Sequence, residues 1–173
     1  MHGILRDTRV ICKRRTVLAG GLGALTLGVS GLRAEVRPRL LRVTAWARPA
    51  VALDRDGLEG LPQVAFETET IWTEGLITFS GPRLRDVLAL AGITEGRILL
   101  KALNDYEVEM DLEEMGEDWP IIATRQNGQP FGVRDQGPLW LVYPYDDEDL
   151  GLSRERIHTL SVWQLVQVQE LPR

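Results

Sequence analysis

Polar and apolar residues alternate along several short segments, which is the pattern of half-buried β-strands. Between residues 64 and 70, Val, Phe and Thr alternate with Ala and Glu, and Tyr106, Val108 and Met110 show the same period of two. More continuous apolar segments predict buried strands. The remaining expected strands are residues 41–47, 76–80, 97–102, 139–143 and 159–169.

Turn residues separate these segments. Asn104-Asp105 predicts a turn between two strands, and Asn127-Gly128 is the strongest hairpin signal in the chain. The segments on either side of Asn127-Gly128, residues 120–125 and 129–131, are the expected hairpin strands.

Two short helices interrupt the predicted strands. Pro82 suits the first turn of a helix that buries one apolar face and ends at Gly92. Asp111 followed by Glu114 predicts a cap on a second helix over residues 111–116. Many strands with two small helices predict a compact, β-rich α+β domain.

The first 34 residues have the pattern of an export signal. Basic residues precede an apolar run over residues 16–29, which is shorter than the ~20 residues needed to span a bilayer. Arg14-Arg15 approaches the twin-arginine pattern, and small residues up to Ala34 supply a cleavage site. Twin-arginine export, general secretion and an uncleaved anchor stay open. We expect a signal peptide, residues 1–34, before a single periplasmic domain, residues 35–173.

Charge and composition exclude several classes of function. Of the 20 basic residues six lie in the leader, whereas it holds one of the 25 acidic residues, so the remaining chain is strongly acidic. Nucleic acids and anionic lipids need basic surfaces, and neither is expected as a partner. The single cysteine, Cys12, lies in the leader, and His158 is the one histidine outside it. These counts argue against disulfides and against zinc, copper or iron sites. The acidic run 146–149 could hold calcium, but a solvated loop is favoured.

Five segments occur in an order that resembles a known family. They are Phe79–Leu88, Asp105-Tyr106, Asn127–Pro130, Gly137–Pro144 and Val162-Trp163. In this order they resemble the sulfite-oxidase-type, molybdopterin-binding oxidoreductase domain, over roughly residues 60–170. The resemblance implies that fold and a pterin ligand. It also implies a metal-ligating cysteine in the strand and loop before Phe79.

The chain departs from that family at the metal ligand. Residues 67–78 contain no cysteine, and Trp72–Gly75 occupies the expected region. Without a protein thiolate, molybdenum loses its anchor. A small, exported, cysteine-free version of the domain resembles periplasmic pterin-binding regulators. By that resemblance it binds a reduced, metal-free pterin and acts on the periplasmic domain of a membrane enzyme of cyclic-di-GMP turnover.

Aromatic and polar residues near predicted turns are the candidate ligand contacts. Planar heterocycles stack on aromatic faces, while carboxylates and arginines bind their polar edges. Each tryptophan has the alternative role of a core residue, and Asp105 that of a turn residue. Trp140 and Tyr143 have opposite parity on one strand, so at most one is expected to line a ligand wall. The candidates are the aromatic residues Trp72, Tyr106, Trp140 and Tyr143 and the polar residues Asp105, Arg125, Arg134 and Asp135.

Two alternatives to a non-catalytic pterin sensor stay open at this point. One is a molybdopterin-dependent oxidoreductase with an atypical metal ligand, which the twin-arginine-like leader favours because that route exports folded, cofactor-loaded proteins. The other is a domain that keeps the fold only as a docking module, in which arginine and aromatic residues mark a protein interface.

Overall fold

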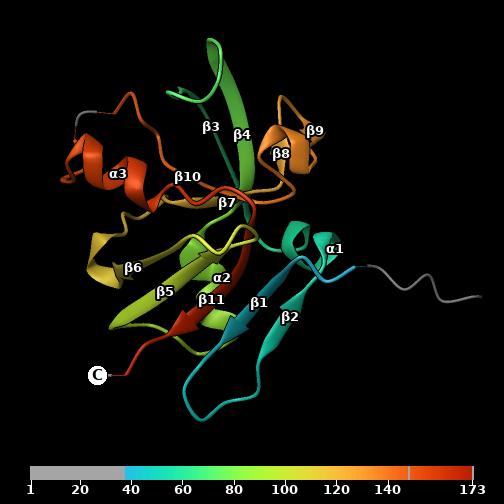
Figure 1. Cartoon of the computed structure of the whole chain (residues 1–173), viewed down its shortest axis with the longest axis vertical. Coiled ribbons are helices and arrows are strands. Elements are labelled where there is room, and N and C mark those ends of the chain that lie inside the picture. Colours follow the sequence, from blue (N-terminus) through green and yellow to red (C-terminus); the bar gives the residue numbers. More distant parts are fainter. Residues whose placement is uncertain (1–37, 148, 173) are drawn as a thin grey trace, which may run out of the picture. The chain divides into compact units, whose positions relative to one another are not determined.

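Within the residues that the computed structural model describes, 38–147 and 149–172, three β-sheets form the framework (Figure 1). The largest has the strand order β2-β1-β11-β5-β6. β1 and β11 run parallel, and the other neighbours are antiparallel. The bounds are β1 Leu41–Thr44, β2 Val51–Leu53, β5 Arg97–Ala102, β6 Glu107–Asp111 and β11 Leu165–Glu170.

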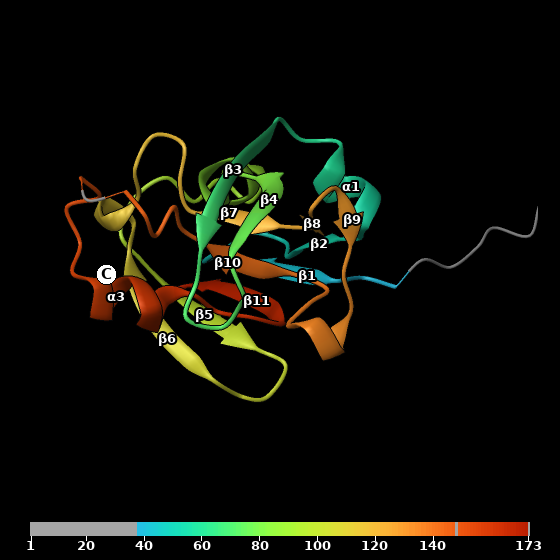
Figure 2. The ribbon, with the colours of Figure 1, turned by 90° about the horizontal axis from the view of Figure 1, so that it is seen from above.

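A four-stranded sheet, in the order β3-β4-β8-β9, carries a long hairpin. A two-stranded sheet of β7 and β10 lies between it and the five-stranded sheet, as both views show (Figures 1 and 2). The bounds are β3 Gln63–Glu69, β4 Leu76–Pro82, β7 Ile121–Ala123, β8 Arg125–Gln126, β9 Gln129–Pro130 and β10 Trp140–Val142.

Short helices connect the strands, and polar side chains fix where several of them begin. Asp54 caps α1, Asp111 and Glu114 form a reciprocal capping box on η1, and Ser153 caps α3. The bounds are α1 Arg55–Glu59, α2 Leu84–Leu90, η1 Leu112–Glu114, η2 Val133–Asp135 and α3 Arg154–Leu160.

The core joins the sheets through large side chains. Phe79 of β4 and Trp140 of β10 are fully buried and meet edge to face, with ring centroids 5.4 Å apart. β4 and β7 approach each other closely at Gly81, where a Cβ atom would collide with the carbonyl oxygen of Ile122. Only glycine fits this position without moving one of the two strands.

The structure confirms most of the expected elements. The alternating segments form β3 and β6, the capping box begins η1, and Asn127-Gly128 turns between β8 and β9. The predicted α+β class, β-rich with a few short helices, is therefore correct.

Two expectations about secondary structure are wrong. Pro82 is the last residue of β4 rather than the first turn of a helix, because the chain stays extended through Arg83 before α2 begins. The predicted long strand 159–169 begins inside α3, which buries Ile157 and Leu160. Gln164 has a positive φ of 52°, and β11 begins after it.

The predicted signal peptide, residues 1–34, lies outside the described residues. In the part that is described, no helix combines the length and the apolar character needed to cross a bilayer.

Candidate functional site

Two cavities open side by side around His158, which lines both. The first has a volume of 310 Å³ and is lined by residues from the end of β3, the segment after β10, and α3. The second has a volume of 280 Å³ and is lined mainly by aromatic residues. Small-molecule sites usually occupy about 300–1,000 Å³, so the pair together has the size of such a site.

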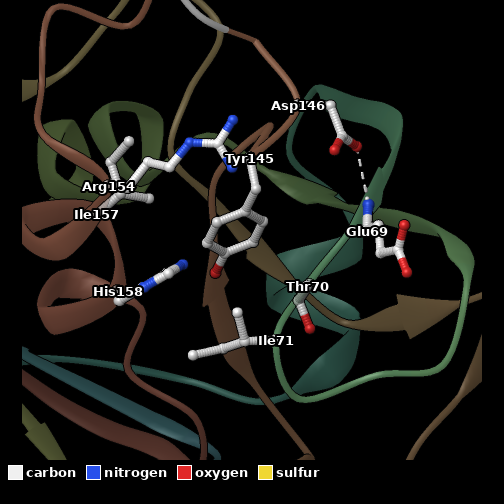
Figure 3. Close-up of a pocket in the computed structure, with 8 residues that line it drawn as sticks. All are labelled: Glu69, Thr70, Ile71, Tyr145, Asp146, Arg154, Ile157 and His158. Carbon is white, nitrogen blue, oxygen red and sulfur yellow. Dashed lines mark hydrogen bonds between the residues drawn. The ribbon is translucent and has the colours of Figure 1, made fainter.

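The first cavity lies between the end of β3 and α3 (Figure 3). Glu69, Thr70 and Ile71 form one side, and Arg154, Ile157 and His158 form the other. Tyr145 and Asp146, from the segment after β10, complete it. The lining therefore combines aromatic, carboxylate, guanidinium and imidazole groups in one place.

Asp146 ties the segment after β10 to the end of β3. Its Oδ2 atom accepts hydrogen bonds from the hydroxyl of Thr68 at 2.9 Å and from the backbone N–H of Glu69 at 2.8 Å (Figure 3 shows the second). Thr68 is fully buried, so this carboxylate satisfies a hydroxyl that has lost contact with water. These two hydrogen bonds fix the position of the cavity wall formed by Glu69, Thr70 and Ile71.

Tyr145 forms the back of the first cavity as a neutral ring. Its hydroxyl donates to Ser161 Oγ at 2.6 Å, and Ser161 donates in turn to the carbonyl oxygen of Ile157. Burial raises the pKa of Tyr145 far above that of an ordinary phenol. Since its hydroxyl is both neutral and already bonded, Tyr145 offers a ligand an aromatic surface rather than a titrating group.

Three polar side chains in the first cavity have no hydrogen bond or ion pair with any described residue: those of Glu69, Arg154 and His158. A carboxylate only accepts hydrogen bonds at neutral pH, a guanidinium only donates them, and an imidazole can do either. The cavity can therefore bind a ligand whose edge carries both donors and acceptors.

Trp72 is the centre of an aromatic cluster whose members line both cavities. It lies in the turn between β3 and β4, and its ring contacts Trp140, Tyr145, His158 and Trp163 at centroid distances of 5.9, 6.2, 5.4 and 5.8 Å. The cluster gives the second cavity an almost entirely apolar lining, completed by Asn104, Tyr106, Ser161 and Val162.

The structure brings some of the aromatic candidates together and separates others. Trp72 and Tyr106 both line the second cavity, while Trp140 is fully buried beneath Trp72. Tyr143 is buried in another cluster, against Trp119 and the sulfur of Met110. Trp140 and Tyr143 thus lie in different environments, as their parity predicts, and neither lines the first or the second cavity.

None of the four polar candidates is among the residues that line these two cavities. Asp105 is exposed in its turn and pairs with Lys101. Arg125 makes a two-pronged ion pair with Glu59 of α1, at 3.1 and 2.9 Å. Arg134 and Asp135 are exposed on η2. Direct contact between these residues and a ligand stays a prediction.

The polar residues that the first cavity brings together are not among the ligand contacts predicted from the sequence. Glu69, Asp146, Arg154 and His158 come from three segments, and Asp146 was assigned to a solvated loop. No local pattern marks them, because they meet only through the pairing of β3 with β4 and the packing of α3. The one available signal was that Glu69 lies in the segment where the family resemblance places its cysteine.

The described residues do not fit a metal held by thiolate, because none of them is a cysteine. Within residues 38–147 and 149–172, no group of three histidine or acidic side chains converges either. The charged residues of the first cavity offer hydrogen bonds to an organic ligand instead.

Comparison with solved structures identifies a shared fold. The crystal structure of the sulfane dehydrogenase SoxCD from Paracoccus pantotrophus matches this chain with a TM-score of 0.56 and 16% sequence identity. The match covers 75% of this chain and 37% of the SoxCD chain, so this protein spans well under half the length of that enzyme subunit. No protein-family model and no curated protein matches the sequence. At this identity the likeness concerns the fold alone, and it agrees with the predicted β-rich α+β class.

Proposed function

We propose that this chain is a periplasmic, non-catalytic protein that binds a reduced, metal-free pterin in the first cavity. One observation carries the proposal. The segment in which the family resemblance expects a metal-ligating cysteine, residues 67–78, forms a wall of this cavity and supplies Glu69, Thr70 and Ile71 instead. This supports a ligand site with an aromatic wall and without a thiolate for a metal.

The chemistry of the lining suits a pterin ring. One edge of a pterin presents an amino group and a ring nitrogen, for which the carboxylate of Glu69 is an acceptor. The carbonyl of the ring accepts hydrogen bonds, which Arg154 can donate. Tyr145 and His158 provide surfaces for the ring to pack against. These residues bind and orient a ligand, and we assign them no catalytic step.

The position of the cavity supports a reporting role. A ligand in the first cavity would contact the end of the β3–β4 hairpin and α3 together. The ligand would bind more tightly to an arrangement in which it contacts both the hairpin and α3. Such a difference in affinity between two arrangements is what a ligand-dependent signal requires. We propose that the periplasmic domain of a membrane enzyme of cyclic-di-GMP turnover responds to this arrangement.

The first experiment identifies the bound molecule. The full chain is expressed in a pterin-producing host, purified without chelators and denatured, and the released material is analysed by mass spectrometry and fluorescence while molybdenum is counted. A near-stoichiometric pterin without metal supports the proposal. A pterin with molybdenum would instead favour an oxidoreductase with an atypical ligand. A chain that is empty and ignores added tetrahydropterin would favour a docking module.

Matched variants locate the ligand. Glu69→Gln and Arg154→Gln should each weaken the binding of tetrahydropterin by about tenfold or more, because each removes a charged hydrogen-bond partner. Glu74→Gln and Arg42→Gln are the controls, since both residues are exposed and neither lines the cavity. Equal affinity in all four variants would place the pterin elsewhere.

A further inference from the structure

Among the four edges of the two larger sheets in the described part of the chain, one differs from the other three. β2 has three residues, and β9 has two, one of them Pro130. On β6, the backbone carbonyl oxygen of Glu109 at the free edge accepts a hydrogen bond of 2.9 Å from the side chain of Arg156 in α3. β3 is an edge strand of seven residues. Proteins usually shorten, cover or interrupt their sheet edges, so the long β3 edge is an exception.

The hydrogen bonds of β4 show which β3 groups face outward. Thr124 and Asn127 donate their backbone N–H groups to the carbonyl oxygens of Ser80 and Thr78. Ser80 and Thr78 therefore direct their backbone groups away from β3. Their cross-strand partners on β3 are Ala65 and Glu67, whose own N–H and C=O groups must then face the free edge.

Most of this edge has no hydrogen-bond partner in the described residues. The backbone N–H of Glu69 donates to Asp146, which agrees with the outward direction of the alternate residues. No described residue bonds to the outward N–H and C=O groups of Ala65 and Glu67. These outward N–H and C=O groups can form backbone hydrogen bonds with an added strand, which is the mode of binding called β-augmentation.

The charge of the edge selects the kind of strand that can add to it. Glu67 and Glu69 are exposed, two residues apart on one face of β3, and exposed Asp146 lies at the same end. A second copy of this strand would place glutamates close to glutamates, which is destabilising. A strand with Lys or Arg at alternate positions would place opposite charges next to them.

We infer that β3 is a docking edge for an extended, basic segment of a partner protein, which adds as a fifth strand beside residues 65–67. This inference rests on the proposed function for the claim that a partner exists. It adds where the partner binds and by what chemistry. Since Glu69 belongs both to this edge and to the first cavity, the docked strand would lie next to the ligand.

The test measures binding of synthetic peptides to the full chain. The probe is a blocked seven-residue peptide with Lys at alternate positions between Val and Thr, and its control carries Glu in place of Lys. We expect the Lys peptide to bind at least tenfold more tightly than the Glu peptide, with affinity falling as salt rises. Equal binding of both peptides, or of neither, would overturn the inference.

Two N-methylated forms of the Lys peptide test for a backbone ladder. Methyl groups are placed on one alternate set of backbone nitrogens in the first form and on the other set in the second. Only one set faces β3 in a ladder. One form should therefore lose binding at least tenfold while the other keeps it. Equal binding of both forms and the parent peptide would contradict strand addition.

Two protein variants locate the peptide on β3. Ala65→Pro removes an N–H group that β4 does not use, so the sheet should persist while peptide binding falls at least tenfold. Glu67→Lys should weaken the Lys peptide and improve the Glu peptide, whereas Glu74→Lys makes the same charge change away from the strand. Unchanged peptide binding in both β3 variants would overturn the inference. It would also be overturned if the wild-type chain formed dimers and the Ala65→Pro variant did not, because the edge would then bind a second copy of the chain.

The same samples separate this inference from the proposed function. Titration with tetrahydropterin reports on the cavity, and titration with peptide reports on the edge. Peptide binding without pterin binding would remove the proposed ligand and keep the docking edge. Pterin binding without peptide binding would keep the ligand and remove the docking edge.

Discussion

The imidazole ring of His158 lies edge-on to the indole ring of Trp72, with ring centroids 5.4 Å apart. His158 belongs to α3 and Trp72 to the turn between β3 and β4. His158 lines both cavities, so this contact joins the hairpin to the helix where the cavities meet. A ligand that moves the hairpin relative to α3 must alter it.

Trp72→Ala should weaken tetrahydropterin binding and reduce the free energy of unfolding by about 2–3 kcal/mol, because the indole is half-buried among four aromatic rings. Trp72→Phe keeps a ring at the position and should restore most of both quantities. Urea unfolding and ligand titration measure them. Wild-type affinity in Trp72→Ala would show that the cluster does not shape the site.

Tyr145→Phe should cost about 1–2 kcal/mol of stability, because it leaves Ser161 Oγ without its buried donor. Pterin affinity should stay within about twofold, since the aromatic wall remains. A large loss of affinity would mean that the hydroxyl contacts the ligand.

Alkaline pH should destabilise the wild-type chain through the same residue. Burial raises the pKa of Tyr145 in the folded state. Its contribution to stability is therefore complete below about pH 10, the ordinary value of a phenol, and decreases as pH rises above it. Unfolding measured from pH 8 to 11 should show a smaller alkaline loss in Tyr145→Phe than in wild type.

Acid pH should weaken the ion pair of Glu114 with Arg156. Hydrogen bonds from Arg156 hold the pKa of Glu114 below its ordinary value. This contribution is complete above about pH 4.3 and is lost as pH falls through the lower folded pKa. Glu114→Gln should thus be less stable than wild type at pH 7, with a difference that shrinks towards pH 3. Glu113→Gln, an exposed neighbour, should show no such trend.

The ion pair of Arg125 with Glu59 should act on stability rather than on ligand binding. It connects β8 to α1, and neither residue lines a cavity. Arg125→Gln and Glu59→Gln should each lower the melting temperature modestly and leave pterin affinity unchanged. Loss of pterin binding in Arg125→Gln alone would restore Arg125 as a ligand contact.

Gly81→Ala should destabilise the chain by more than about 3 kcal/mol, because the new Cβ would collide with the backbone carbonyl of Ile122 on β7. Gly132→Ala is the matched control, since nothing lies within 4 Å of a Cβ at that position. Thermal unfolding of both variants measures the difference. Equal stabilities would mean that β4 and β7 can separate at little cost.

Local patterns in the sequence were sufficient for elements whose stability is local. Alternation identifies β3 and β6, and the capping box at Asp111 and Glu114 identifies the start of η1. They were insufficient for residues 159–169, where an apolar segment is compatible with either a strand or a helix. The cap at Ser153 and the burial of α3 decide that choice.

The candidate site was harder to predict, because its parts are distant in sequence. The hydrogen bond from Thr68 to Asp146 joins residues 78 positions apart, and no spacing rule relates them. Aromatic residues were better signals, since Trp72 and Tyr106 do line a cavity. Charged residues near turns, such as Arg134 and Asp135, resemble ligand contacts in sequence but are exposed on η2.

The position of β11 sets the order in which the domain can be built. β11 pairs with β1 on one side and with β5 on the other, so this late strand joins the β1–β2 hairpin to the β5–β6 hairpin. Without β11, the hairpins β1–β2 and β5–β6 share no strand pairing. The five-stranded sheet can therefore be completed only once Leu165–Glu170 has been synthesised, so its assembly comes late relative to that of either hairpin.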